Sequence, residues 1–594
     1  MLRRLLLPAA LLAPAFVLVA QKQTPLPHTL APHEHALIRD YRDSRATDGR
    51  GITTPPPGPV RTMAEWEEIQ SLVLCWAQYE GILKQIVRHA KQECEVIIVC
   101  DDAADVTAYL NNSQYGGPLD NLDNITLVEG PYNSIWSRDY FAESIYLNEV
   151  DSLFLLDWIY NRPRPLDDAM SDLVGGFKGI PVYGTTAAPN DLVHTGGNFM
   201  CDGFGTAFSS WLVMDENGPN GQFNQTVKNE AQVDAIMNTW MGIQPGRYIK
   251  MPTLPYDNIH HIDMHMKLLD EEHLLVGEFP LGLSDGPQIE SNLDDVTATY
   301  NSVFGTPYEV IRVPMPPSTG GNYPPDASYR TYANNVFING TVLVPTYRTA
   351  YDTVGLRILQ ESLPGYKVVG IDCDDQGLNI ISASGAIHCI TKGIGVSDPL
   401  LIRHQRLDDT YETVDPYAVE AYIRHRTGIA SAQLYWTVDT AAGFAAVPLT
   451  DQGGDVWAGA IPAQPVGTRI FYYIEATANS GKVQVRPLVA PAGWWSFRVL
   501  DANTAVNPVE GPSFAALYPN PATAIVVVGV EAGCDERVEL RLLDATGRLV
   551  RTLFHGRVPP DGRLFVDVAA LPVGVYRLEL LGAAGRSTRG LLKQ

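Results

Sequence analysis

Between residue 61 and about residue 408, short apolar runs recur along the chain, the pattern expected of buried strands. They cover residues 72–76, 96–100, 125–128, 153–156 and 342–344. Stretches with helical spacing lie between several of these runs, at residues 82–90, 227–241 and 354–363. Strands that alternate with helices predict an α/β fold for this part of the chain.

After residue 408 the helical spacing stops, and short β patterns follow one another between turn residues. They lie at residues 432–437, 457–461, 470–475 and 494–500. This spacing predicts an immunoglobulin-like β-sandwich over residues 408–501. A linker at 501–512 leads to residues 513–594, where β patterns at 538–543 and 574–578 predict a second, small β-sandwich.

The first 20 residues have the pattern of a secretory signal peptide. Arg3 and Arg4 precede an apolar run that is too short to span a bilayer and ends in Leu-Val-Ala. Residues 21–60 are rich in Pro and His without a sustained apolar period, so we expect a flexible leader or a propeptide. No later apolar run has spanning length, so we expect an exported protein without a membrane span.

Composition narrows the classes of function. A chain of 594 residues is too long for one core, and its formal net charge of -24 disfavours nucleic acid and suits cationic ligands. Such acidity is also an ordinary solubility feature of secreted proteins. Seven cysteines are too few and odd in number for a disulfide scaffold, so at least one thiol stays unpaired.

Cys389 is the candidate for a reactive thiol. It ends a turn of small residues that begins at Ser384. A cysteine attacks only as the thiolate, which needs exposure and a nearby cation or base, and a lone cysteine is more often a buried core residue. Three other motifs favour the reactive interpretation: Trp-Ser-Arg-Asp at 136–139, His-His-Ile-Asp-Met-His at 260–265 and Tyr-Ala-Asn-Asn at 332–335.

In this order the motifs resemble those of the guanidino-group-modifying superfamily. They are most similar to the branch with agmatine deiminase and the bacterial, Porphyromonas-type peptidylarginine deiminase, and motifs at 63–67, 196–198 and 339–345 fit the same branch. The resemblance covers roughly residues 60–400. It implies a five-bladed α/β propeller (pentein) of ββαβ units over residues 61–407, and hydrolysis of an arginine guanidinium to citrulline and ammonia.

Deimination assigns a role to each motif. It needs carboxylates that bind the cation, a thiolate that attacks its central carbon and an acid that protonates ammonia. Asp139 and Asp263 can bind the guanidinium, although either aspartate alone could be a cap or a surface charge. His261 and Asp263 alternate in an apparent strand, so we expect both on one face and His260 on the other. His261 is then the general acid and base.

Further residues follow from the same resemblance. Asn334 matches the family's Tyr-x-Asn and is implied to order the thiolate region, and Trp136 is implied to bind substrate. His388 should project away from Cys389 on an extended segment, so we expect a structural role for it. None of these roles needs a metal or another cofactor.

Arg162 and Arg164 lie on a proline-stiffened loop shortly after Asp139. Two fixed cations would capture a carboxylate, which agmatine lacks and a peptide ending in arginine has. The Arg-Pro-Arg motif resembles that of the peptidylarginine deiminase branch, where it confers preference for C-terminal arginine. The expected partner is therefore a peptide or protein with arginine, although an isolated basic turn is the ordinary interpretation of such a pair.

The C-terminal segment carries a second resemblance. Tyr-Pro-Asn-Pro at 518–521, Gly-Val-Tyr at 574–576 and the terminal Leu-Leu-Lys are similar to the sorting domain read by the type IX secretion system. This implies the type IX machinery as a partner. The expected location is secreted or attached to the outer-membrane surface, after removal of the signal peptide.

Three alternatives remain open from the sequence. One is an agmatine deiminase-like enzyme that acts on a small guanidine. Another is a zinc-dependent hydrolase with His261, Asp263 and His265 as ligands. The third is a non-enzymatic surface adhesin. Alkylation of Cys389, chelation of metal and release of ammonia would separate them.

Overall fold

The computed structural model describes residues 26–47, 50–280, 282–375, 378–501, 512–531, 537–559, 561–582 and 585–594. The predicted signal peptide at 1–20, nearly all of the linker and Cys534 lie outside these residues. The cysteines that are described, Cys389 among them, are all free and buried.

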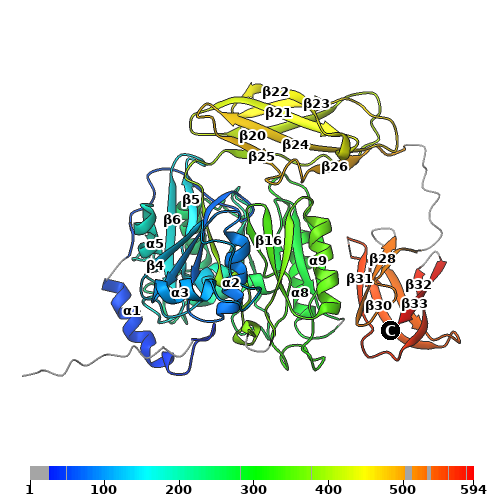
Figure 1. Cartoon of the computed structure of the whole chain (residues 1–594), viewed down its shortest axis with the longest axis horizontal. Helices are drawn as coiled ribbons and strands as arrows, with labels where there is room; N and C mark the ends of the chain where they lie inside the picture. Colours follow the sequence, from blue (N-terminus) through cyan, green and yellow to red (C-terminus); the bar gives the residue numbers. More distant parts are fainter. Residues whose placement is uncertain are drawn as a thin grey trace, which may run out of the picture.

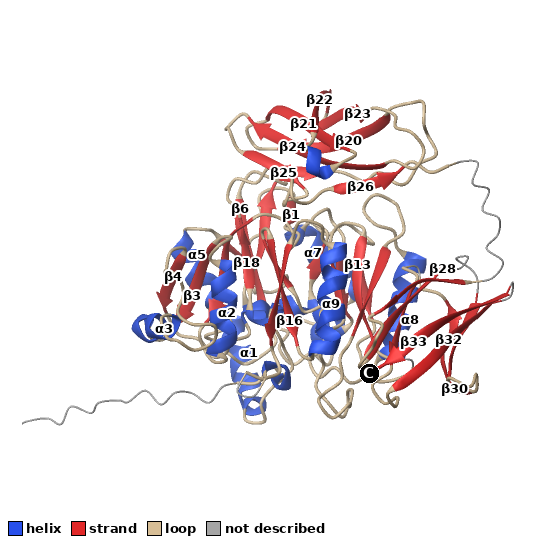
Figure 2. Ribbon diagram, turned by 45° about the vertical axis from the view of Figure 1, so that its right-hand side comes forward, coloured by secondary structure: helices blue, strands red, loops and turns tan. Residues whose placement is uncertain are grey.

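The described residues between 60 and 395 form five small sheets with helices between their strands, which confirms the predicted α/β class (Figures 1 and 2). The first contains β1 (Val60–Thr62), β5 (Glu143–Leu147), β6 (Leu153–Tyr160), β7 (Val182–Thr185) and β8 (Val193–His194). The next two are β9 (Met200–Cys201), β10 (Ala207–Ser210) and β11 (Tyr248–Met251), then β12 (Met266–Leu268), β13 (His273–Glu278) and β14 (Glu309–Pro314). The last two are β15 (Val336–Ile338), β16 (Thr341–Thr346) and β17 (Lys367–Asp372), then β18 (Lys392–Gly395), β2 (Ile69–Cys75), β3 (Glu95–Cys100) and β4 (Ile125–Glu129).

Each of these sheets repeats one ββαβ pattern. Its middle strand pairs antiparallel on one side and parallel on the other, as β13 does with β12 and β14. A parallel pair needs a crossover, and a helix supplies it each time. These helices are α2 (Glu80–Ala90), α5 (Met170–Lys178), α7 (Glu230–Met241), α8 (Gly286–Thr299) and α9 (Thr349–Ser362). The pairing of β18 with β2 brings the two ends of this region into one sheet.

The periodicity of the sequence located these elements well. Helices α2, α7 and α9 cover the three stretches with helical spacing, and strands β2, β3, β4, β6 and β16 cover the apolar runs. Short helices also occur between strands, namely α3 (Ala103–Leu110), α4 (Ser137–Tyr140) and α6 (Leu212–Asn217). The chain also contains 3-10 helices, and three of them, Gly196–Asn198, Ile262–Met264 and His388–Ile390, carry motifs of the candidate site.

Residues 401–498, all within the described part, form an eight-stranded antiparallel sheet, at the top of Figure 1. Its strands are β19 (Leu401–Arg403), β20 (Tyr417–Arg424), β21 (Ile429–Thr437), β22 (Ala445–Gly453), β23 (Val456–Ile461), β24 (Arg469–Ala478), β25 (Val483–Arg486) and β26 (Trp495–Arg498). Alternate residues of β20 are buried, and they join a hydrophobic cluster built from this region alone. The predicted change to β structure is therefore confirmed.

The C-terminal residues form two further sheets, at the right of Figure 1. One contains β27 (Ser513–Tyr518), β28 (Ile525–Glu531) and β31 (Arg563–Asp567), and the other β29 (Arg537–Leu543), β30 (Leu549–Arg557), β32 (Gly574–Gly582) and β33 (Gly585–Lys593). This part packs against α9. Arg563 pairs with Glu361 at 3.1 Å, and the Arg357 guanidinium lies 4.0 Å from the centre of the Tyr518 ring.

The leader contains regular structure, so the prediction of a flexible segment is wrong for residues 34–47. A 3-10 turn at Glu34–Leu37 continues into α1 (Ile38–Thr47), at the lower left of Figure 1. Ile38 and Tyr41 anchor this helix in a small hydrophobic cluster. Their buried apolar partners are Ile159, Val193 and Phe223. Two apolar positions make too short a pattern to reveal a helix from the sequence.

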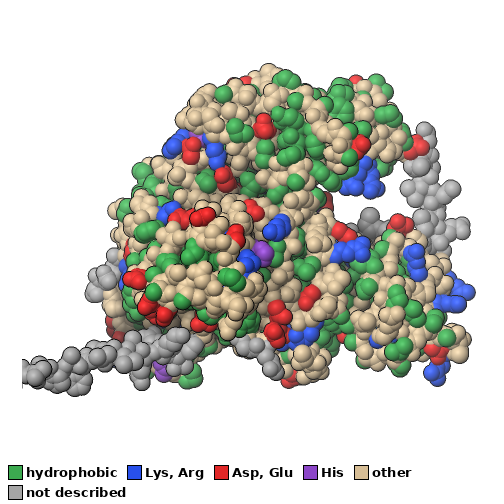
Figure 3. All heavy atoms as spheres, viewed as in Figure 1, with side chains coloured by type: hydrophobic (Ala, Val, Ile, Leu, Met, Phe, Trp, Pro, Cys, Tyr) green, Lys and Arg blue, Asp and Glu red, His purple; other side chains and the backbone are tan. Residues whose placement is uncertain are grey.

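Charge is distributed over the surface without strong separation on the face shown in Figure 3. Asp and Glu side chains are spread over the α/β part, with Lys and Arg side chains scattered among them. None of the helices that the structure describes is long and apolar enough to cross a membrane.

Candidate active site

Short turns carry the candidate residues to one buried place. Asp139 lies in α4, Cys389 in the 3-10 turn His388–Ile390, and Asp263 in the 3-10 turn Ile262–Met264 that His261 precedes. These residues and Asn334 are at most 3% exposed. Cys389 is therefore a buried thiol, unlike the exposed one that reactivity suggested.

Cys389 has a carboxamide and a carboxylate beside its sulfur. Asn334 Nδ2 donates to Sγ at 3.2 Å, and Sγ lies 3.6 Å from Asp263 Oδ2. Burial, followed by the negative charges of Asp263 and Asp139, raises the pKa of the Cys389 thiol well above its ordinary value. The sulfur is therefore held as a thiol while no substrate cation lies beside it.

Asp263 is fixed by its neighbours through one oxygen only. Its Oδ2 lies 2.7 Å from His388 Nδ1 and accepts from Asn334 Nδ2 at 3.0 Å. Its Oδ1 is buried and has no hydrogen-bond partner among the described residues. A buried carboxylate oxygen without a donor is costly unless a ligand supplies one, so Oδ1 is a candidate contact for a cationic ligand.

Two predictions about local geometry are wrong. Ile262–Met264 form a 3-10 turn instead of a strand, and His260 has a φ of +57°, so alternation between two faces does not apply. His388 also lies in a turn, and its side chain reaches Asp263 on one side and Glu65 Oε2, at 2.8 Å, on the other. It orients a site carboxylate. The position of His388 directly before Cys389 is the sequence signal that could have indicated this role.

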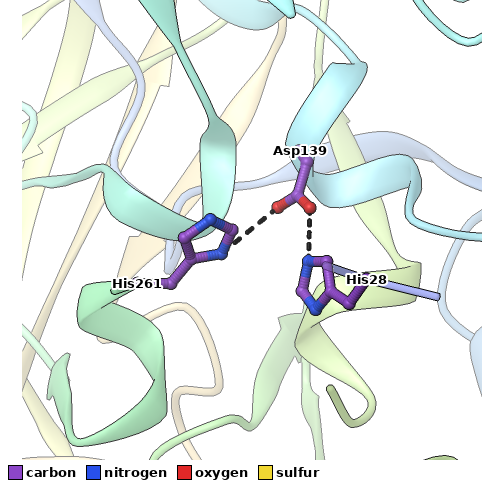
Figure 4. Close-up of side chains that lie close together, drawn as sticks. All are labelled: His28, Asp139 and His261. Carbon is purple, nitrogen blue, oxygen red and sulfur yellow. Dashed lines mark hydrogen bonds and ion pairs between the residues drawn. The ribbon is translucent and has the colours of Figure 1, made fainter. Parts of the chain in front are cut away.

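Asp139 and His261 form the second half of the site. Asp139 Oδ1 lies 3.6 Å from His261 Nδ1, as the dashed line in Figure 4 shows. Burial lowers the pKa of His261 to about 4, although the charge of Asp139 opposes this shift. The ring is therefore neutral at pH 7 and able to accept a proton.

Gly197 explains the Gly-Gly-Asn motif at 196–198. Its backbone N–H donates to Asp139 Oδ1 at 3.3 Å. A Cβ atom at this position would lie 2.5 Å from His261 Nδ1 and 2.9 Å from Asp139 Oδ1, both far inside van der Waals contact. Only glycine lets the backbone approach both side chains at once.

The potential metal ligands differ from those of the zinc alternative. Among the described residues, the group of three whose ligand atoms come within 4.8 Å of one another is His28, Asp139 and His261, drawn in Figure 4. His265 and Asp263 are not part of this group. The trio proposed from the spacing at 261–265 is therefore not gathered by the fold.

Comparison with known proteins identifies the family. Residues 61–394, more than half of the chain, match the family described as Porphyromonas-type peptidyl-arginine deiminase. The chain belongs to this family. It is thus a deiminase-family hydrolase of guanidino groups, and the adhesin alternative receives no support. Residues 516–594 match a secretion system C-terminal sorting domain, which implies a secreted or cell-surface location through type IX secretion.

Several relatives of this deiminase align with it over nearly their whole length. A protein of Vibrio parahaemolyticus provisionally named agmatine deiminase is 22% identical over 380 residues, 58% of this chain and 98% of that protein. Agmatine deiminase of Pseudomonas aeruginosa is 22% identical over 57% of this chain and 96% of its own. A solved structure from Porphyromonas gingivalis, provisionally named arginine deiminase, has 20% identity and a TM-score of 0.48, covering 56% of this chain and 98% of that one.

A residue that the sequence did not reveal lies at the centre of the deiminase site. His28, from the leader, is fully buried and stacks on Trp136 with the ring centres 4.1 Å apart and the planes 5° from parallel. Its Nε2 pairs with Asp139 Oδ2, and its Nδ1 lies 2.8 Å from the carbonyl oxygen of Ser384. Trp136 therefore lines the site with a histidine ring against it, and its role in substrate binding stays a prediction.

The two predicted carboxylate-binding arginines also contact the leader. Arg162 Nε donates to the carbonyl oxygen of His28 at 3.1 Å. Arg164 holds the Glu34 carboxylate with two hydrogen bonds, at 2.7 Å from Nε and 3.0 Å from its terminal nitrogen, with both side chains at most 2% exposed. The loop after β6 thus brings both arginines to the site.

Proposed function

We propose that this deiminase hydrolyses the guanidinium of arginine at the C-terminus of peptides, to citrulline and ammonia, through a covalent bond to Cys389. The observation that carries the proposal is the pair of hydrogen bonds from Arg164 to a buried carboxylate. An arginine that already binds one carboxylate in this geometry can bind the terminal carboxylate of a peptide.

Binding of the guanidinium would activate the nucleophile. Asp139 and Asp263 would accept its N–H groups, with Asp263 Oδ1 as an available acceptor. Burial and the two carboxylates now raise the pKa of Cys389, and the cation would offset the carboxylates' share, because a neighbouring positive charge favours the thiolate. Substrate would therefore help to create the thiolate that attacks it.

After the substrate binds, the reaction would need one group, His261, that first acts as a base and then as an acid. Neutral His261 accepts the thiol proton, Sγ bonds to the central guanidinium carbon, and the imidazolium beside Asp139 returns the proton to the departing ammonia. Water attacks the resulting amidino-thioether, His261 removes its proton, and the C–S bond breaks to give citrulline and the free thiol. Asn334 would steady the sulfur through its 3.2 Å hydrogen bond.

A small guanidine is the second candidate substrate, because the relatives from Vibrio and Pseudomonas carry the name agmatine deiminase. Agmatine would meet the same carboxylates and thiol. It has no carboxylate for Arg162 and Arg164, so the two candidates differ only at these arginines.

Citrulline or carbamoyl product would be measured with free arginine, agmatine, a peptide with internal arginine and a peptide ending in arginine. We expect the highest kcat/KM for the last of these. Efficient turnover of agmatine with little activity on the peptide would move the assignment to a small-guanidine deiminase.

We also propose the finer architecture. Five ββαβ sheets, with the ends of the region joined by β18 and β2, support a five-bladed α/β propeller over about residues 61–407. Separate hydrophobic clusters support an immunoglobulin-like domain at 408–501 and a sorting domain at 513–594. Strand β19, which precedes residue 408, pairs with β20, and this pairing favours a first boundary nearer residue 400 than 408. A signal peptide at 1–20 and a propeptide at 21–60 complete the proposal.

A further inference from the structure

The leader fills the site at the position proposed for a substrate guanidinium. His28 offers one ring nitrogen to the Asp139 carboxylate and the other to the Ser384 carbonyl oxygen. Both partners can only accept hydrogen bonds, so both ring nitrogens donate, and a ring that donates twice carries a positive charge. A flat cation thus lies against Trp136 and Asp139, as a guanidinium would.

The leader also fills the carboxylate end of the site. Besides the Glu34 carboxylate, Arg164 binds the carbonyl oxygens of Pro27 at 2.8 Å and Thr29 at 3.2 Å. Glu34 Oε2 in turn accepts from the backbone N–H of Ala31 at 2.7 Å, which keeps the segment in a tight turn. One short segment therefore engages Asp139, one of the two proposed guanidinium contacts, together with the proposed carboxylate contacts Arg162 and Arg164.

Anchors on either side hold this segment in place. Ahead of His28, Trp136 Nε1 donates to the carbonyl oxygen of Leu26 at 3.1 Å. Behind it, Tyr41 in α1 donates to the carbonyl oxygen of Tyr160 at 3.3 Å. Tethering makes the inhibitor's local concentration high, on the order of millimolar for a short flexible connection. A free substrate would compete poorly against it.

We propose that residues 26–47 are a built-in competitive inhibitor, in which His28 takes the place of the substrate guanidinium until the segment is cut away or displaced. The proposal rests on the proposed function of the same site. His28 blocks the site without being consumed, because its nitrogens belong to a ring and cannot leave as ammonia. Activation would follow cleavage in the stretch after α1, where residues 51, 52 and 54 are exposed.

The first test compares His28→Ala with the uncut wild type and with His35→Ala as a matched control, since His35 is an exposed histidine of the same segment. Two rates are measured: turnover of a peptide ending in arginine, and alkylation of Cys389 by the small cationic reagent chloroacetamidine. Loss of one charge-assisted contact should raise both rates about tenfold to a hundredfold. His35→Ala should match the wild type. Rates for His28→Ala equal to those of the wild type would overturn the proposal.

The second test acts after folding, so it does not depend on the stability of the variant. A recognition sequence for a specific protease is placed within residues 51–57 of the full chain, and both rates are measured before and after cleavage and dilution. We expect both to rise, and an added peptide of residues 26–47 to inhibit again, whereas the same peptide with His28→Ala should not. Equal alkylation before and after cleavage would refute inhibition by the segment. Faster alkylation without turnover of any guanidine would support the block and refute the proposed function instead.

Discussion

Asp139 uses its two carboxylate oxygens for different partners. Oδ1 faces His261 and the N–H of Gly197, while Oδ2 pairs with His28 (Figure 4). Despite the cost of burial, the charge of His28 beside Oδ2 holds the pKa of Asp139 far below its usual range. A guanidinium could therefore replace His28 at Oδ2 without disturbing His261. Asp139 would therefore bind the leader in the inhibited state and the substrate during catalysis.

Gly197→Ala should abolish most activity without unfolding the protein. The added Cβ must displace His261 and Asp139, whose geometry the chemistry needs. We expect kcat/KM to fall by about a hundredfold or more, the cost typical of a 1 Å misplacement. Gly176→Ala is the control, because a Cβ there meets nothing within 4 Å. Normal kinetics in Gly197→Ala would remove Asp139 or His261 from the reaction.

At the scale of elements, we propose that the loop after β6 determines substrate choice. In the deiminase with its leader cleaved away, Arg162→Ala should depress activity on peptides ending in arginine about tenfold to a hundredfold, since one charge-assisted contact is lost. Activity on small guanidines without a carboxylate should change little. Arg426→Ala, which removes a surface arginine paired with Asp398, is the control. Equal losses on both substrate classes would show that Arg162 only supports the fold.

The sequence indicated which residues lie together in the site but not the backbone conformation of the turns that carry them. Periodicity located α2, α7 and α9 because these helices have one buried face. The motifs named Cys389 and Asp263, which do lie together. A 3-10 turn has no long periodic pattern, so the strand expected at residues 261–265 was wrong.

His28 lies beyond what the sequence pattern could reveal. It meets Asp139 across 111 residues, and no local spacing encodes such a contact. The Pro and His content around it favoured a segment without structure. Its ordering depends on tertiary partners, chiefly Trp136 and Arg162, which a single sequence does not bring together.

For the whole molecule, buried histidines predict instability in acid. Burial lowers the pKa values of His261, His265 and His404 to about 4 each, from an ordinary value of 6.5. The unfolded chain then binds these protons at a higher pH than the folded one. The free energy of unfolding should therefore fall as the pH drops from about 6.5 to about 4. Urea denaturation at several pH values measures this, and a constant midpoint over that range would contradict it.

The C-terminal part should be dispensable for catalysis and required for export. Removal of residues 513–594 leaves every candidate site residue in place but uncovers α9, where Tyr518 and Arg563 now pack. We expect unchanged kcat/KM, a modestly lower melting temperature and retention of the protein inside the cell. A folded but inactive truncated protein would show that this part contributes to the site.

Covalent catalysis by Cys389 is tested most directly by mass spectrometry of the reaction of a peptide ending in arginine with the deiminase after its leader has been cleaved away. The wild type should convert the terminal arginine to citrulline with release of one ammonia per peptide, and acid quenching during turnover should trap the amidino-thioether on Cys389. Cys389→Ala should bind the peptide but form neither product nor adduct. Citrulline formed by Cys389→Ala at the wild-type rate would contradict the mechanism.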